Sequence, residues 1–303
     1  MKSKRINSTM IALAITVALC GSAFAQSAAS QGASKTVNTK AQITYHDGPL
    51  MYGTSAVYFL WYGCWDETCR AGNTATQTIV SDFMSNLGGS PYFQINAMYP
   101  GAFGNTPSGG LIFGGAAFDR YSHGLELTAA DIREIVEDAI ESNQLPQDPS
   151  SIYVVLASAD VSSNATGFCI PGALPHHGIG EALGSQVRYA FVGNALRCPT
   201  VAAAQFVASN GTLLPTPNGN LAADAMVSTL AHLLNVVVTN PSGGGWFDRY
   251  GLQNADKCVG QFGSTWLVNG ARANLKLGLR DYLIQHNWVN SDRKPHCAIN
   301  SSL

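Results

Sequence analysis

The sequence predicts an α/β (α+β) fold in which helices flank a mixed sheet, in a loop-rich chain that contains disulfides. Short apolar runs typical of buried strands alternate with amphipathic helix patterns, but without the strict rhythm of repeated βαβ units. Glycine is abundant, at 31 residues, and charged residues make up only 12% of the chain. This balance is typical of a folded, loop-rich protein and not of a disordered one.

Five segments have the composition of strands. Residues 57–62 form a continuous apolar and aromatic run that ends at Gly63, the pattern of a strand buried on both faces. The predicted strands are 57–62, 91–99, 151–157, 187–192 and 282–288. Residues 100–115 contain six glycines and two prolines, which predicts an irregular loop.

Three segments have the spacing of amphipathic helices. The first is 76–87. The second has Thr128 as its N-cap, with Asp131 reaching back to complete a capping box. The third is expected to be capped by Asp224 and to end before the Asn-Pro pair at 240–241.

The first residues have the order of a secretory signal peptide. Lys2, Lys4 and Arg5 precede an apolar run at 10–19, and Ala-Phe-Ala at 23–25 supplies small residues for cleavage. The alternative is an uncleaved anchor helix, but the run is shorter than the roughly 20 residues that span a bilayer. We therefore expect a secreted protein with no membrane span.

The predicted divisions of the chain are a signal peptide at 1–25, a flexible leader at 26–40 and a single domain at 41–303. No long linker or internal repeat follows residue 40. Loss of the three cations in the signal peptide moves the formal charge from −2 to about −5. A negative charge disfavours nucleic acid as a partner.

An even number of cysteines remains after the signal peptide is removed, and in an exported chain this pattern predicts disulfides. They are Cys64, Cys69, Cys169, Cys198, Cys258 and Cys297. Six cysteines allow many pairings. We expect a local Cys64–Cys69 bridge, with Cys169–Cys198 and Cys258–Cys297 closing loops of roughly 30 to 40 residues. The chain has no Cys-x-x-Cys pair, which disfavours a cysteine metal site.

Catalytic motifs are scarce. The chain has no glycine-rich phosphate loop, no Gly-x-Ser-x-Gly and no His-Glu-x-x-His. Of its seven histidines, His232 is the one on a predicted helix. A single helical histidine among apolar neighbours is more typical of a hydrogen-bonded core residue than of a ligand.

Several ordered segments resemble the EXORDIUM-like, phosphate-induced protein family. The resemblance begins with Ile-Thr-Tyr-His-Asp-Gly-Pro at 43–49 and extends over most of the mature chain. The matching segments are 43–51, 57–65, 153–161, 189–199, 224–241, 246–258 and 281–288. The family is best known from plants, as exported proteins of the cell-wall space linked to growth and nutrient responses. The resemblance implies the same kind of location and role here.

The chain departs from the family at its most suggestive motif. Members usually read His-Glu-Leu-x-Glu before Thr-Asn-Pro, which is similar to the metal-binding helix of the zincin proteases. Here His232 is kept, but Leu233 and Val236 stand at the two glutamate positions, and Gln253 replaces another glutamate. Leucine and valine cannot bind zinc or transfer a proton. The resemblance therefore implies a zincin-like helix in a pseudoenzyme. The helix pattern itself places Leu233 with Leu230 and near Leu234 on an apolar side, so we expect Leu233 to face the core.

The cysteines depart from the family as well. Members tend to have two cysteines near Cys169 and two near Cys198, whereas each cluster keeps one in this chain. The resemblance therefore supports a Cys169–Cys198 pair.

The first functional hypothesis is a secreted protein with a non-catalytic binding or signalling role, whose partner is a wall polysaccharide or an extracellular protein. Aromatic side chains expected to be exposed could stack on sugars or on a partner, although core packing is the alternative for about half of them. They are Trp65, Tyr92, Tyr99, Trp246 and Tyr250. This hypothesis assigns no catalytic residue, no metal and no cofactor.

The second hypothesis is a secreted zinc-dependent metallohydrolase with an atypical ligand set. Its ligands would come from a candidate pocket of polar residues. These residues are His176, His177, His232, Asp248, Gln253 and Asp256. The missing glutamates favour the first hypothesis over this one.

Overall fold

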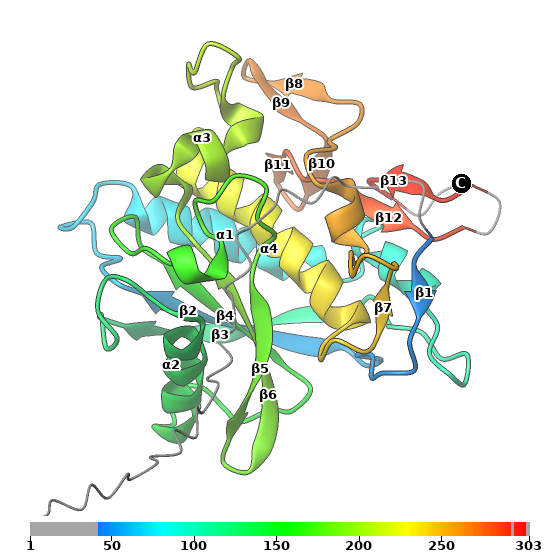
Figure 1. The fold of residues 1–303 in the computed structure, drawn as a ribbon. Helices are drawn as coiled ribbons and strands as arrows, with labels where there is room; N and C mark the ends of the chain where they lie inside the picture. The colour runs from blue at the N-terminus through cyan, green and yellow to red at the C-terminus, as the bar shows by residue number, and fades with distance from the viewer. Residues whose placement is uncertain (1–41, 292–293, 301–303) are drawn as a thin grey trace, which may run out of the picture. The chain divides into compact units, whose positions relative to one another are not determined.

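A mixed five-stranded sheet organises the residues that the computed structural model describes, 42–291 and 294–300 (Figure 1). The strand order is β3-β2-β4-β6-β5, in which β5 is antiparallel to β6 and the other neighbours are parallel. The strands are β2 (Ser55–Tyr62), β3 (Leu111–Asp119), β4 (Ile152–Ala157), β5 (His177–Ala182) and β6 (Ser185–Val192). The predicted signal peptide and leader lie outside the described residues.

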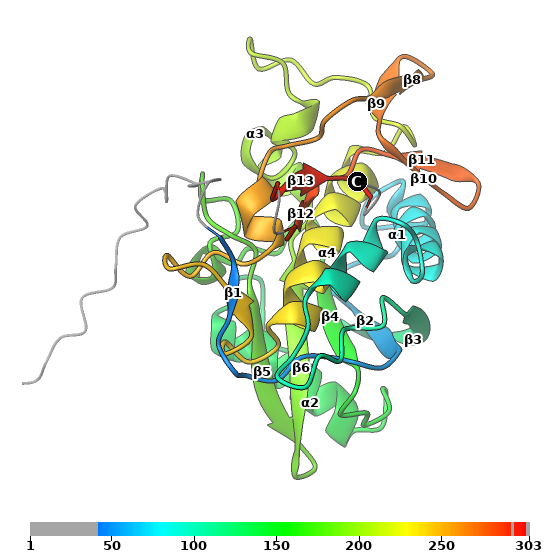
Figure 2. The same ribbon diagram turned by 90° about the vertical axis from the view of Figure 1, so that its right-hand side faces the viewer.

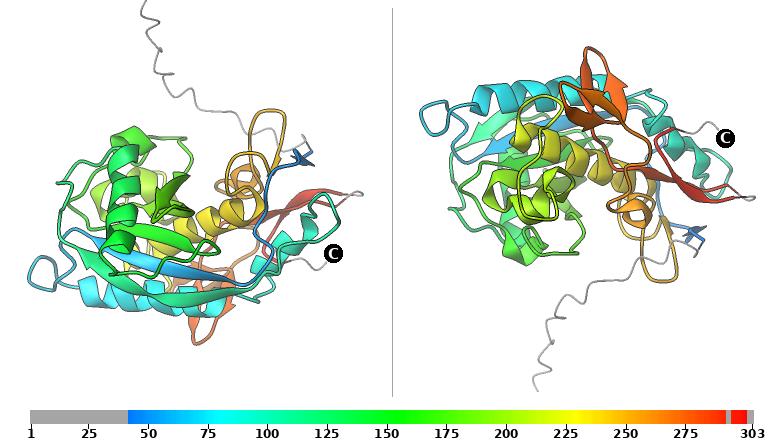
Figure 3. Two further views of the ribbon diagram at one scale, coloured as in Figure 1. Left: turned by 90° about the horizontal axis from the view of Figure 1, so that it is seen from below. Right: turned by 90° about the horizontal axis from the view of Figure 1, so that it is seen from above.

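The sheet has an apolar core on each face, because successive side chains of a strand point to opposite sides. Val154 packs with the core of α1 (Asn73–Leu87) and α4 (Leu221–Thr239), whereas Val155 packs with that of α2 (Ala129–Glu141). Figure 2 shows α1 and α4 side by side, and Figure 3 shows α2 on the opposite face of the sheet. The predicted fold class, a mixed sheet flanked by helices, is confirmed.

Short paired strands and turns of helix surround these layers. The pairs are β1 (Thr44–Tyr45) with β7 (Trp246–Phe247), β8 (Trp266–Val268) with β9 (Ala271–Ala273), β10 (Leu275–Leu277) with β11 (Arg280–Tyr282), and β12 (Asn287–Val289) with β13 (His296–Ala298). The helical turns include α3 (Pro199–Ala202), η1 (Phe93–Met98) and η5 (Ala255–Cys258). Three disulfides, Cys64–Cys69, Cys169–Cys198 and Cys258–Cys297, are the pairs expected from the sequence.

The start of α2 follows the sequence prediction. The Thr128 hydroxyl accepts a hydrogen bond from the Asp131 amide, and the Asp131 carboxylate accepts one from the Thr128 amide. The hydrogen bond from the Thr128 amide lowers the pKa of Asp131 below its ordinary value, and burial raises this pKa by a smaller amount. Both of these otherwise unpaired amides are thereby satisfied.

The cap predicted for α4 was wrong. Asn220, not Asp224, caps the helix, through a hydrogen bond from the Ala223 amide to the Asn220 side chain at 3.0 Å. Asp224 lies in the first turn, where its carboxylate accepts hydrogen bonds from the amide and the side chain of Asn218. Residues 221–239 are long and apolar enough to cross a membrane, but 89% of this window is buried inside the fold, as in a core helix.

The strand predicted at 91–99 is the 3₁₀ helix η1. The chain turns into this helix at Ser90, whose hydroxyl accepts a hydrogen bond from the amide of Phe93, the first helical residue. The tyrosines at the two ends are held by their hydroxyls, with Tyr92 donating to the Gln285 carbonyl and Tyr99 to the Trp288 carbonyl. Aromatic residues that suggested a strand thus anchor a helical turn instead.

Two further boundaries differ from the prediction. The segment 282–288 is split between β11 and β12, because the Asn274 side chain bonds both the amide and the carbonyl of Ile284 and takes the place of a neighbouring strand. The loop predicted at 100–115 ends earlier, since β3 starts at Leu111.

Candidate functional site

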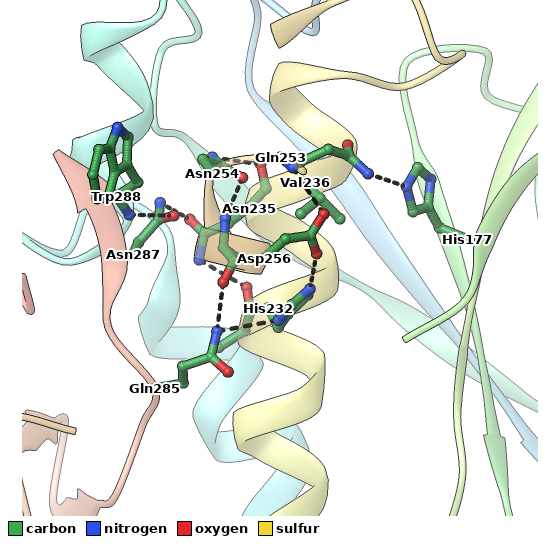
Figure 4. A network of polar contacts seen from close by, with 12 residues as sticks. His177, His232, Asn235, Val236, Gln253, Asn254, Asp256, Gln285, Asn287 and Trp288 are labelled. Atoms are coloured by element: carbon green, nitrogen blue, oxygen red, sulfur yellow. Dashed lines mark hydrogen bonds and ion pairs between the residues drawn. The ribbon is translucent and has the colours of Figure 1, made fainter. Parts of the chain in front are cut away.

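The side chain of His232 is the centre of a buried hydrogen-bonded chain that joins α4, η5 and the segment before β12 (Figure 4). His232 Nε2 lies 2.8 Å from Asp256 Oδ1, and His232 Nδ1 lies 3.1 Å from Gln285 Nε2. Gln285 Nε2 also donates to the Ala255 carbonyl at 2.8 Å. We call Asp256–His232–Gln285 the His232 chain.

These contacts determine which ring nitrogen of His232 carries the proton. The Ala255 carbonyl can only accept, so the atom of Gln285 that faces it is the amide nitrogen. This same nitrogen donates to His232 Nδ1, which must therefore offer a lone pair. Nε2 then carries the proton and donates it to Asp256. Both nitrogens of the imidazole are thus occupied, and neither has a lone pair left for a metal ion.

Asp256 is held as a carboxylate. Burial raises its pKa, but the hydrogen bonds from His232 and from the Gln253 amide outweigh this effect and bring the pKa below its ordinary value. The carboxylate therefore anchors the proton on His232 Nε2 and fixes the orientation of the ring.

His177 and Gln253 form a second polar contact beside the His232 chain. His177 Nε2 lies 3.2 Å from Gln253 Nε2. Burial lowers the pKa of His177 to about 4, so the ring is neutral at pH 7. Among the described residues, His177 Nδ1 and Gln253 Oε1 are buried without a hydrogen-bond partner. This pair therefore has hydrogen-bonding capacity that the protein does not use.

The structure brings together four of the six residues of the candidate pocket, His177, His232, Gln253 and Asp256. His176 lines a cavity next to them, and its Nε2 is also buried without a partner among the described residues.

Asp248 does not join the site. Its carboxylate forms a fully buried ion pair with Lys257 Nζ at 3.0 Å and also accepts hydrogen bonds from the amides of Tyr250 and Leu252. Asp248 therefore holds a turn of the loop before η5, and its place in the candidate pocket was wrong.

The positions expected for carboxylates lie in apolar surroundings. Leu233 is 0% exposed and Val236 is 1% exposed, and both belong to the core between α4 and the sheet. The predicted inward orientation of Leu233 is confirmed. In the described part of the chain, two groups place three metal-binding side chains close together, and neither contains His232. One is His123 with Asp131 and Glu134, and the other includes the disulfide-bonded pair Cys64–Cys69.

Sequence reasoning missed a set of buried amides that lies beside the His232 chain, about one turn further along α4. We call Asn96, Asn235, Asn254 and Asn287 the asparagine cluster. Asn235 Oδ1 accepts from Asn96 at 2.6 Å and from Asn287 at 3.0 Å, while its own amide donates to the Tyr92 hydroxyl and to the Ala231 carbonyl. The signal in the sequence that could have indicated this cluster was the presence of asparagines inside apolar runs.

Most of the aromatic side chains expected at the surface are buried. Trp65, Tyr92 and Tyr99 lie in the core, Trp246 is partly buried, and Tyr250 is 47% exposed. The expectation of exposure was wrong for the first three, which belong to the core between the sheet and α4, where Trp65 packs against Trp61 of β2. Core packing, the alternative reading, explains them.

Comparison with known proteins gives the same family as the sequence pattern. The profile of the family described as "Phosphate-induced protein 1 conserved region" matches residues 43–276. The chain is 28% identical to Protein EXORDIUM-like 3 of Arabidopsis thaliana over 286 residues, 82% of this chain and 80% of that protein.

Two further relatives have the same level of identity. Protein EXORDIUM of Arabidopsis thaliana is 28% identical, covering 76% of this chain and 77% of its own length. Protein PHOSPHATE-INDUCED 1 of Nicotiana tabacum is 28% identical, covering 73% and 72%. No solved structure is significantly similar to the chain. The chain belongs to the phosphate-induced protein 1 family, which includes the EXORDIUM-like proteins.

Proposed function

We propose that this chain is a secreted, extracellular member of the family with a non-catalytic binding role. Its relatives are EXORDIUM-type plant proteins, and its three disulfides fit an oxidising compartment outside the cytoplasm. The signal peptide predicted at 1–25 supports the same location. A wall polysaccharide or an extracellular protein as partner, and a signalling role, remain predictions.

The observation that carries the non-catalytic reading is the occupation of both His232 nitrogens. A catalytic zinc site normally uses three protein ligands and keeps one position open for water. In this chain Nδ1 accepts from Gln285, Nε2 donates to Asp256, and the family's glutamate positions are the apolar Leu233 and Val236. Helix α4 therefore keeps the histidine of the expected zincin-like helix, but the described residues around it offer no free set of zinc ligands.

Metal analysis of the secreted protein tests this proposal. After exposure to zinc and dialysis against metal-free buffer, we expect well below about 0.1 zinc per chain and no hydrolysis of peptides, because a single occupied imidazole cannot retain zinc. His46→Ala, which changes an exposed histidine, serves as the control for His232→Ala. About one zinc per chain that is lost in His232→Ala, but kept in His46→Ala, would overturn the proposal.

A further inference from the structure

A cavity of about 240 Å³ lies against the His232 chain. Its walls come from the segment 166–176, which contains Cys169 of the Cys169–Cys198 disulfide, from α3 and the turn after it, and from α4. His232 and Gln285 are both lining residues. This volume lies just below the range of roughly 300 to 1,000 Å³ that is usual for ligand sites, so the cavity suits a molecule of about one ring.

Most of the cavity wall is apolar. It includes the side chains of Phe168, Ile170, Leu174, Phe191 and Phe262. None of the described lining residues is an aspartate, glutamate, lysine or arginine. Burial lowers the pKa of the lining His176 below its ordinary value, so this ring is also uncharged near pH 7. A charged ligand would lose its hydration here without gaining an opposite charge.

One end of the cavity has unused hydrogen-bonding groups. Because Gln285 Nε2 is fixed by His232 and by the Ala255 carbonyl, the position of Gln285 Oε1 is fixed as well. In Figure 4 this oxygen points away from His232, and it accepts no hydrogen bond from the described residues. The Ser228 hydroxyl, which also lines the cavity, accepts from the Gln285 amide at 3.2 Å and keeps its own proton to donate.

We infer that this cavity binds a small uncharged alcohol or phenol with an apolar body. The hydroxyl donates to Gln285 Oε1 and accepts from Ser228, and the body packs between the phenylalanines. A sugar fits poorly, because most of its hydroxyls would face apolar walls without partners. The inference rests on the proposed binding role, which it deepens by naming the chemical class of the ligand.

Titration of the isotope-labelled protein followed by NMR tests the inference with benzyl alcohol as the probe. Toluene has the same body without the hydroxyl, benzoate adds a charge, and glucose is a polyol. We expect saturable shifts at residues lining the cavity with benzyl alcohol, and binding at least about tenfold weaker for the other three. Equal binding of toluene would contradict the role of Gln285 and Ser228 in binding a ligand hydroxyl. Preferred binding of glucose would contradict a ligand with an apolar body.

Two variants place the probe in this cavity. Ala202→Phe fills the space and should abolish binding of benzyl alcohol, whereas Ala130→Phe on α2, outside the cavity lining, should leave it unchanged. Ser228→Ala should reduce the preference for benzyl alcohol over toluene. Unchanged binding in Ala202→Phe would overturn the assignment.

Zinc measured on the same sample separates the two proposals. A zinc-free protein that binds no benzyl alcohol contradicts only the ligand class. A protein with stoichiometric zinc contradicts the non-catalytic role as well.

Discussion

Two neighbouring groups of buried polar residues, which meet successive turns of α4, differ in how completely they are hydrogen-bonded (Figure 4). In the asparagine cluster every side-chain amide N–H has an acceptor within the protein, and the cluster joins η1, α4, η5 and β12. Next to this cluster, the His232 chain and the His177–Gln253 pair leave Gln253 Oε1 and His177 Nδ1 without partners among the described residues. Gln285 Oε1 accepts no hydrogen bond there either.

This difference separates polar groups that specify the fold from those available to a ligand. A buried amide with all its partners stabilises one arrangement of the surrounding elements. A buried polar atom without a partner costs free energy, and a ligand that pairs with it can recover that cost. The cavity lies against the His232 chain, in the group where such atoms remain.

The largest effect is expected from Leu233→Glu, which places a carboxylate in the apolar core of α4. An unpaired buried charge should lower the free energy of unfolding by about 4 kcal/mol or more. Urea denaturation with the disulfides intact measures this change, and Leu233→Met, expected to cost less than about 1.5 kcal/mol, is the size-matched control. A loss below about 1 kcal/mol for the glutamate would mean that this face of α4 opens to water.

Asn235→Ala should have the next largest effect. It removes the acceptor shared by Asn96 and Asn287 and leaves one N–H of each of these amides unpaired, which should cost about 3 kcal/mol in the free energy of unfolding. Asn105→Ala, at an exposed loop position, should change it by less than about 0.5 kcal/mol. Equal effects of the two would show that the asparagine cluster does not stabilise the fold.

Acidification should lower the free energy of unfolding through His177, which lies beside the His232 chain. Its pKa is about 4 in the folded protein, below the ordinary 6.5, so between these values the unfolded chain binds more protons. The contribution of the neutral ring is therefore complete above pH 6.5 and is lost as the pH falls towards 4. It amounts to about 2 kcal/mol between pH 7 and pH 5.

The variant His177→Leu isolates this contribution from those of other histidines. It should reduce the fall in unfolding free energy from pH 7 to pH 5 by about 2 kcal/mol relative to the parent. An unchanged pH slope in His177→Leu would mean that His177 is accessible to water in the folded state.

The smallest effect is expected from Gln253→Met. This substitution loses the hydrogen bond to His177 but also removes the unpaired Gln253 Oε1, so the two changes offset each other. We expect the midpoint of urea unfolding to shift by the equivalent of less than about 1 kcal/mol. A cost near that of Asn235→Ala would contradict the difference between the asparagine cluster and the His177–Gln253 pair.

Much of the fold could be predicted from local pattern. The strands at 57–62, 151–157 and 187–192 were correct because continuous apolar runs are typical of buried strands, and Thr128 and Asp131 indicated a capping box. The strand predicted at 91–99 was wrong because tertiary hydrogen bonds of its tyrosines outweigh its local pattern.

The site could be predicted only in part. The family resemblance singled out His232 and Gln253, and the structure places Asp256 beside them. The resemblance could not indicate that Asp248 forms an ion pair with Lys257, since this contact depends on how the loop before η5 turns. Gln285 was missed because it lies in a segment whose pattern predicted a strand.

The most direct test is the protonation of His232. Nitrogen-detected NMR of the imidazole in the parent, with His232→Gln used to assign the signals, reports which ring nitrogen carries the proton. At pH 7 we expect the proton on Nε2, an unprotonated Nδ1, and no change after one equivalent of zinc is added. Protonation of Nδ1, or loss of the Nε2 proton when zinc is added, would contradict the hydrogen bonds assigned to His232. His232 would then again be a candidate metal ligand.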